Sequence, residues 1–220
     1  MSEPQLDWRT LLRNPELFDT LVGQNDYLDE FVRVHKTIAW PRHLDERPGL
    51  VQRYSWAVPS DAALDLIARY APIVEMGAGS GYWTHLMRDR GIDVVAYDRE
   101  RPHADNYFAQ HLWTDVLPGR PSVLRQHWDR SLFLCWPPNN SAMGTNCLKQ
   151  WQGRHLIHVG EWRISTGSKG FHDRIEAGFD LVEKLSIPQW EGMYDMLTVW
   201  KRDEAFSSMP EGPMRKPNAK

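Results

Sequence analysis

Three glycines at alternate positions, Gly77, Gly79 and Gly81, follow a short apolar run that contains an acid, Glu75. Glycine allows a tight backbone turn and lets a ligand approach the main chain without a Cβ in the way. A helix that follows such a turn presents free amide groups at the same place. Asp98 ends the next apolar run, where its carboxylate is placed to accept hydrogen bonds from both hydroxyls of a ribose. The pattern predicts a nucleotide-like ligand, and the alternative is an ordinary glycine-rich turn between a strand and a helix.

The spacing of the glycines distinguishes several kinds of ligand. A dinucleotide-binding turn needs Gly-x-Gly-x-x-Gly, so its third glycine would stand at position 82, which is Tyr82. The acid at Glu75 would repel a pyrophosphate, whereas a cationic sulfonium amino acid tolerates it. A Walker phosphate loop is excluded, because no Gly-Lys-Ser/Thr follows. The loop therefore favours a sulfonium ligand, with a dinucleotide as the alternative.

The segments that must position this loop alternate between strand and helix patterns. Residues 6–34 carry apolar side chains at helical spacing, and residues 35–59 are irregular and rich in Pro and Trp. Ser60 suits the N-cap of a helix that ends at Pro72, and further helices are predicted after the glycine loop, at 142–151 and at 170–177. The predicted strands cover 73–76, 94–98, 132–136, 156–159, 179–187 and 196–200, with weaker ones near 113–116 and 123–124.

The last two predicted strands are joined by only eight residues, 188–195. Such a link is too short for a crossover helix, so this pair should be antiparallel. The earlier alternation of strands and helices predicts a parallel sheet with helices on both faces. We therefore expect an α/β three-layer sandwich with a mostly parallel sheet, preceded by an N-terminal helical or irregular cap at 1–58. The core domain would span 59–202, and the polar stretch 203–220 should be disordered.

With its glycine loop, acids and terminal hairpin, the sequence resembles class I S-adenosylmethionine-dependent methyltransferases over about residues 60–202. The resemblance implies a seven-stranded sheet of order 3-2-1-4-5-7-6 with strand 7 antiparallel. It also implies S-adenosyl-L-methionine as methyl donor and S-adenosyl-L-homocysteine as product. In such enzymes the loop contacts the methionine end and the acid after the second strand binds the ribose. The cofactor contacts that it implies are Glu75, Gly77, Ala78, Gly79, Gly81, Tyr97, Asp98, Asp115, Cys135, Trp136 and Pro137.

Trp136-Pro137-Pro138 ends the fourth major strand at the same edge of the sheet. This segment is similar to the Asn/Asp-Pro-Pro-aromatic motif of amino-group methyltransferases, although only the prolines match. Trp136 is predicted to form an aromatic wall beside the sulfonium or the substrate, where a cation–π contact is worth about 0.5–2 kcal/mol. The alternative is a tryptophan that only fills space.

Other residues near this edge are candidates for contact with the methyl acceptor. Glu161 follows the fifth strand, where its carboxylate would orient an amine or hydroxyl or act as a weak base, unless it is a solvated loop acid. Together with Trp136 it forms the predicted catalytic pair. The predicted substrate contacts are Trp56, Pro138, Glu161 and Trp162, with a packing role as the alternative for Trp56. Eleven tryptophans are present, and five lie in predicted loops that could line an apolar pocket: Trp40, Trp56, Trp136, Trp162 and Trp190.

Composition narrows the choice of partners and location. The net charge is −3 and the isoelectric point is near 6.3, which argues against nucleic acid as partner. No apolar run is long enough to cross a membrane and no signal peptide is recognisable, so a cytoplasmic location is expected. The protein is expected to be a monomer or a homodimer. Cysteine clusters and helical His-x-x-x-His pairs are lacking, so no metal is expected.

These features together predict methyl transfer to an N or O nucleophile of a small-molecule or peptide-like acceptor. One alternative is an RNA or protein N-methyltransferase. Another is a non-catalytic regulatory protein that binds S-adenosylmethionine.

Overall fold

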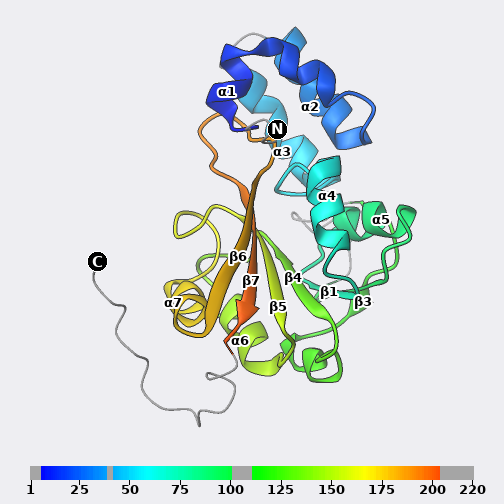
Figure 1. Cartoon of the computed structure of the whole chain (residues 1–220). Helices are drawn as coiled ribbons and strands as arrows, with labels where there is room; N and C mark the ends of the chain where they lie inside the picture. Colours follow the sequence, from blue (N-terminus) through cyan, green and yellow to red (C-terminus); the bar gives the residue numbers. More distant parts are fainter. Residues whose placement is uncertain (1–5, 39–41, 101–110, 204–220) are drawn as a thin grey trace, which may run out of the picture.

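The computed structural model describes residues 6–38, 42–100 and 111–203, and it consists of a central sheet with helices on both faces and a helical layer at one edge (Figure 1). The strands are β1 (Ile73–Met76), β2 (Val94–Asp98), β3 (Leu117–Pro118), β4 (Ser131–Cys135), β5 (His155–Gly160), β6 (Phe179–Ser186) and β7 (Met196–Arg202). The α-helices are α1 (Trp8–Arg13), α2 (Asp26–Thr37), α3 (His43–Arg53), α4 (Asp61–Ala68), α5 (Tyr82–Asp89), α6 (Met143–Gln150) and α7 (Lys169–Gly178). Two 3-10 helices are η1 (Pro15–Thr20) and η2 (Pro121–Gln126).

The sheet has the predicted order, β3-β2-β1-β4-β5-β7-β6. Strands β1 to β5 are parallel, and β7 runs antiparallel to both β5 and β6. The carboxyl ends of β1, β2, β4 and β5 therefore lie at the same edge as the amino end of β7. Below, this edge is called the carboxyl edge.

Side chains of the central strands alternate between two cores. Ile73, Phe133 and Ile157 pack with α4 and α5 on one face, where Trp83 and Met87 are buried. Leu132, Leu134 and Leu156 pack with α6 and α7 on the other face. These strands carry apolar residues continuously because both of their faces are covered by helices.

A third core joins the N-terminal helices to the rest of the chain. Tyr27 of α2 donates its backbone N–H to the hydroxyl of Tyr82 at 3.1 Å, and Trp190 donates its indole N–H to the hydroxyl of Tyr27 at 3.3 Å. Tyr82 begins α5 and Trp190 lies between β6 and β7, so the cap is held to two elements that are far apart in sequence. Figure 1 shows α1, α2 and α3 beyond the end of the sheet to which the β6–β7 connection leads.

Three expectations about secondary structure are wrong. Part of the segment expected to be irregular forms α3, which contains Pro48. The predicted strands at 113–116 and 123–124 are absent; the third strand is the two-residue β3, and 123–124 belong to η2.

Ser60 caps α4 as predicted, because its hydroxyl accepts the N–H of Ala63 at 3.3 Å. The tail predicted to be disordered lies, except for Asp203, outside the described residues.

Candidate active site

The glycine loop connects β1 to α5 in a backbone conformation that needs glycine at each alternate position. The φ angles of Gly77, Gly79 and Gly81 are +81°, +54° and +75°, a region that other residues rarely adopt. Loop amides also tie the turn to β2, because the N–H groups of Gly77 and Ala78 both donate to the carbonyl of Tyr97, at 2.8 and 3.1 Å. The loop is therefore a tight turn at the carboxyl edge, and it opens onto the start of α5.

Space around the loop is equally restricted. A Cβ at Gly81 would lie 2.9 Å from Cγ2 of Val116, and one at Gly77 would lie 2.7 Å from Cε of Met143. Real Cβ atoms do not make contacts this short. Packing therefore favours glycine at position 81 as well as conformation does, whereas the flexible end of Met143 could move away from a Cβ at position 77.

Asp98 lies at the end of β2 with its carboxylate against this loop. One oxygen accepts the N–H of Gly79 at 2.9 Å, and the other accepts the N–H of Glu100 at 3.1 Å. A carboxylate has about four acceptor positions. Asp98 thus has acceptor capacity left for two ligand hydroxyls, as its predicted role as ribose acceptor requires.

Glu75 differs from the charged acid that the sequence suggested. Its side chain is 1% exposed and accepts a hydrogen bond from the hydroxyl of Thr84 in α5. Burial raises the pKa of Glu75 to about 8, although the Thr84 hydrogen bond opposes this shift. A carboxyl that is mostly protonated at neutral pH neither repels a pyrophosphate nor attracts a sulfonium. The charge of Glu75 therefore distinguishes a sulfonium from a pyrophosphate less well than the sequence suggested. Contact between Glu75 and a cofactor stays a prediction.

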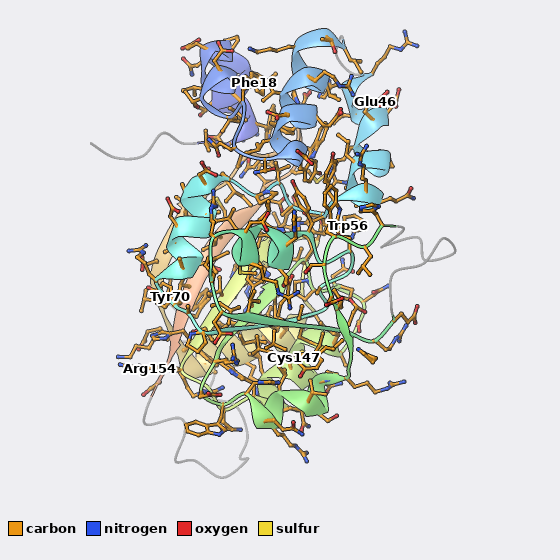
Figure 2. The ribbon with its side chains drawn as sticks, turned by 90° about the vertical axis from the view of Figure 1, so that its right-hand side faces the viewer. Phe18, Glu46, Trp56, Tyr70, Cys147 and Arg154 are labelled. Atoms are coloured by element: carbon orange, nitrogen blue, oxygen red, sulfur yellow. The ribbon has the colours of Figure 1, made fainter. Side chains whose placement is uncertain are left out.

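Trp136 occupies the end of β4 in a conformation that is rare for a residue with a side chain, with φ of +51°. Its backbone N–H donates to the carbonyl of Val159 at 2.8 Å, which fixes the turn against β5. The indole stacks on Trp56 with ring centroids 5.0 Å apart and an interplanar angle of 19°. Figure 2 shows Trp56 between the N-terminal helices and the sheet. Two predicted residues from distant segments are therefore brought together as one aromatic surface.

Two buried acids lie beside this pair. Glu161 is 2% exposed and accepts the backbone N–H of Tyr194 at 2.8 Å, so it is a buried group and not a solvated loop acid. Asp195 is 1% exposed and accepts the indole N–H of Trp136 at 2.6 Å. Burial raises the pKa of Asp195 to about 7, the Trp136 hydrogen bond opposes the rise and repulsion from Glu161 adds to it. A carboxyl with this pKa exchanges a proton near neutral pH.

Asp195 was not predicted from the sequence, although the topology contained a signal for it. It immediately precedes β7, and Met196 of β7 pairs with Gly160 of β5. Because β7 runs antiparallel to β5, an acid just before β7 lies at the same edge of the sheet as an acid just after β5. The predicted hairpin thus placed Asp195 beside Glu161.

The other predicted cofactor residues have defined surroundings. Tyr97 contacts the loop through its carbonyl, and its hydroxyl lies 3.0 Å from Nε2 of His127. Asp115 is exposed, and its carbonyl accepts a hydrogen bond from Arg88. Burial raises the pKa of the Cys135 thiol well above its usual range.

The two prolines after Trp136 connect this edge to the segment that follows β5. The carbonyl of Pro137 accepts the N–H of Gly167 at 2.6 Å, and Pro138 forms an isolated bridge with Thr166. One lone pair of the Pro137 carbonyl is therefore already used within the chain. Contact of either proline with a ligand stays a prediction.

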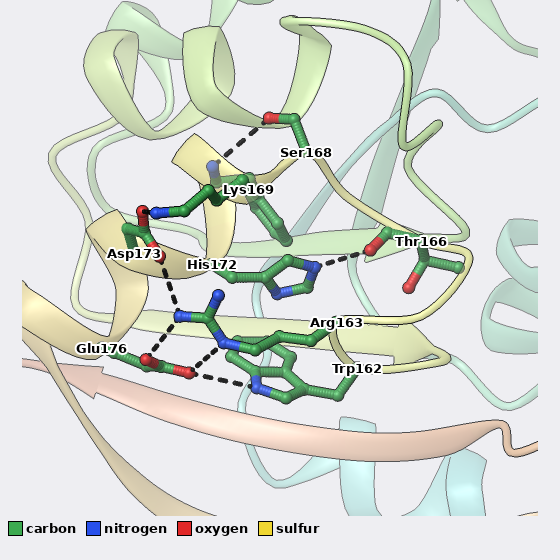
Figure 3. Close-up of polar contacts among 9 residues, drawn as sticks. Trp162, Arg163, Thr166, Ser168, Lys169, His172, Asp173 and Glu176 are labelled. Carbon is green, nitrogen blue, oxygen red and sulfur yellow. Dashed lines mark hydrogen bonds and ion pairs between the residues drawn. The ribbon is translucent and has the colours of Figure 1, made fainter.

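Trp162 belongs to a cluster with Arg163, Asp173 and Glu176 (Figure 3). Its indole stacks on Trp200 at 4.7 Å and donates to Glu176 of α7 at 3.3 Å. Arg163 forms ion pairs with Glu176 at 2.6 Å and with Asp173 at 2.9 Å. These contacts hold α7 to the segment after β5, which gives Trp162 a structural role that its predicted contact with substrate did not anticipate.

Trp190 is fully buried in the cap core, and Trp40 lies outside the described residues. Within the described ranges there is no group of three or more His, Cys, Asp or Glu side chains arranged to hold a metal ion. No helix of the described residues is long and apolar enough to cross a membrane.

Comparisons with known proteins agree with this fold. No family model matches the chain. An alignment 73 residues long, which covers 29% of this chain and 26% of the other protein, gives 40% identity to ribosomal RNA small subunit methyltransferase A of Anaeromyxobacter dehalogenans. The matched segment thus spans about a quarter of the length of this curated relative.

Among solved structures, the chain is similar to a Klebsiella pneumoniae protein named as a candidate O-methyltransferase. The TM-score is 0.50 with 16% identity, over 87% of this chain and 97% of that one. A Streptococcus pneumoniae protein named as a candidate tRNA (m1A22) methyltransferase gives a TM-score of 0.45 with 13% identity, over 66% and 71% of the two chains. At 16% identity the likeness to the Klebsiella pneumoniae protein concerns the fold alone.

Proposed function

We propose that this chain is a methyltransferase that uses S-adenosyl-L-methionine and releases S-adenosyl-L-homocysteine. The observation that carries the proposal is the glycine loop at the carboxyl edge. Three glycines with positive φ lie against an Asp98 carboxylate that has unused acceptor capacity, in a sheet of order 3-2-1-4-5-7-6. Ligands of open α/β sheets bind at this edge.

The residues present fit such a cofactor. Asp98 would hold the ribose hydroxyls, the glycine loop would lie along the methionine end, and Trp136 would line the site beside the sulfonium. When bound, the cofactor supplies a methyl group on a positively charged sulfur. The protein's own work is then to align the acceptor with that methyl group and to exclude water.

The acceptor that we propose is an N or O nucleophile of a small-molecule or peptide-like metabolite, enclosed by a cap formed from residues 1–58. The Trp56–Trp136 stack supports an acceptor with an apolar body. Glu161 and Asp195 support a nucleophile that carries a proton, since a carboxylate next to an N–H or O–H group orients it by hydrogen bonding. Asp195, whose pKa burial raises to about 7, is suited to take up that proton.

RNA is the second class of acceptor, favoured by the 73-residue match to a ribosomal RNA methyltransferase. The net charge of −3 and the buried acids beside Trp136 favour the small acceptor over RNA. Transfer of a radiolabelled methyl group to a small-molecule extract, but not to total RNA, would decide between them.

Calorimetry with S-adenosylmethionine and S-adenosylhomocysteine tests the central proposal. Binding of both is expected, and binding of neither would overturn it. Binding without transfer to any acceptor fraction would indicate a regulatory protein instead of an enzyme.

A further inference from the structure

An arginine of the cap lies at the candidate acceptor site without a hydrogen-bond partner for its buried nitrogens. Arg47 belongs to α3, and its guanidinium carbon lies 5.5 Å from the ring centroid of Trp56 and 5.7 Å from that of Trp136. The Nε and Nη2 atoms are buried and donate to no acceptor in the part of the chain that the structure describes. The two rings stabilise the cation through their faces, but they satisfy none of its N–H groups.

Buried N–H groups of a charged side chain are costly when they lack an acceptor, and proteins nearly always provide one. Asp195 lies near enough for the charge of Arg47 to oppose the rise in its pKa, but neither buried nitrogen of Arg47 donates a hydrogen bond to it. Asp195 accepts from Trp136, and Glu161 accepts from Tyr194. The acceptor atoms for Arg47 are therefore best supplied from outside the chain, by a bound molecule.

We propose that Arg47 binds a carboxylate of the methyl acceptor, so that the substrate is a small carboxylic acid whose apolar body lies against Trp56 and Trp136. This inference rests on the proposed function, because it concerns the acceptor of the same site. The guanidinium presents its N–H groups as a planar fork that matches the two oxygens of a carboxylate. A phosphate has the same kind of oxygens but carries more negative charge, which Asp195 and Glu161 would repel.

The test uses a fluorinated probe, because the acceptor itself is unidentified. Binding of 4-fluorobenzoate to the full chain is followed by 19F NMR with and without S-adenosylhomocysteine, beside 4-fluorobenzamide and 4-fluorophenyl phosphate. The benzoate is expected to bind more tightly than the amide or the phosphate. Arg47→Gln should weaken benzoate binding at least tenfold and leave amide binding unchanged. Arg53→Gln, which removes a charge from an exposed arginine of the same helix, is the matched control and should bind the benzoate as the wild type does.

Arg47→Lys covers the case in which Arg47→Gln fails to fold. It keeps the charge and loses the fork, so benzoate binding should weaken several-fold while the salt dependence of binding persists. Equal benzoate binding by wild type and both Arg47 variants would overturn the inference, as would an amide that binds as tightly as the acid or a phosphate that binds more tightly. No benzoate binding to a protein that does bind S-adenosylhomocysteine would also overturn it, without affecting the proposed cofactor. Failure of S-adenosylhomocysteine to bind would overturn the proposed function, and the probe measured alone would still test Arg47.

Discussion

Replacing Glu75 by Gln should make the protein more stable, by an amount that grows with pH. The side chain is buried beneath the glycine loop, and burial raises its pKa from an ordinary value of 4.5 to about 8. The folded state therefore keeps a proton that the unfolded chain has already lost. For a carboxyl whose pKa is raised on folding, stability is greatest below the unfolded pKa and falls as the pH rises towards the folded pKa.

The size of the effect follows from the shift. Each pH unit between the two pKa values lowers the free energy of unfolding by up to about 1.4 kcal/mol. Between about pH 5 and pH 7.5 this sums to roughly 3 kcal/mol, a large part of the 5–15 kcal/mol that stabilises a typical domain. Glutamine has nearly the same shape, does not titrate, and its amide oxygen keeps an acceptor for the Thr84 hydroxyl.

The measurement is urea unfolding followed by tryptophan fluorescence at several pH values between 5 and 7.5, for wild type and Glu75→Gln. The difference between the two must be used, because buried histidines act in the opposite direction. Burial lowers the pKa of His35 to about 4 and that of His158 to about 3, so they make the protein more stable as the pH rises towards 6.5. These contributions cancel in the difference.

The variant's advantage should grow by roughly 3 kcal/mol across this range. Asp65→Asn, which removes an exposed acid from α4, is the control for the loss of one negative charge. An advantage of Glu75→Gln that is constant with pH would refute the reasoning, since Glu75 would then be charged at neutral pH in the folded protein.

Three further predictions concern the same edge of the sheet. Asp98→Ala should weaken binding of S-adenosylhomocysteine about 10- to 100-fold in calorimetry, because hydrogen bonds to a charged group are lost. Asp98→Asn should lose less affinity, and unchanged affinity of the alanine variant would reject the ribose role. Gly81→Ala should lower the free energy of unfolding by about 1–3 kcal/mol. The loss should exceed that of Gly91→Ala, because Gly91 also has a positive φ but its added Cβ would meet open space. Equal losses would show that the contact with Val116 is harmless. Trp136→Phe removes the N–H that Asp195 accepts, so the pKa of Asp195 should rise above about 7. Infrared titration of the Asp195 carboxyl band, identified with Asp195→Asn, should show a higher midpoint than in the wild type. An unmoved midpoint would contradict the role of this hydrogen bond.

Most of the fold was predictable because its main strands are covered on both faces. Continuous apolar runs identified them, and the short link between β6 and β7 required that pair to be antiparallel. The third strand left no such pattern, since Leu117 and Pro118 are exposed. The apolar residues at 113–116 have another cause: Trp113 stacks on Tyr54, and Val116 lies against Gly81. α3 was missed because Pro48 and Gly49, which disfavour helix, lie inside it.

The site was predictable where one local segment forms it. The glycine loop and Asp98 are close in sequence, and their spacing alone located them at the carboxyl edge. Arg47 and Trp56 belong to one stretch of the chain, whereas Trp136 and Asp195 come from two stretches far from it in sequence. Nothing in the local sequence of one stretch indicates the others. The charge state of Glu75 was equally hidden, since it depends on how completely α5 covers the strand.

The hydrogen bond between Tyr27 and Trp190 also affects how the chain folds while it is being synthesised. The two residues are 163 positions apart, and the indole is part of the core that the N-terminal helices bury. A ribosome that adds about 5–20 residues per second needs roughly 8–33 s to cover that distance. During this time the helices before Trp190 that share its core have their apolar faces exposed, because that partner is not yet synthesised. These N-terminal helices should therefore be among the last parts of the protein to reach their final packing, although they are synthesised well before Trp190.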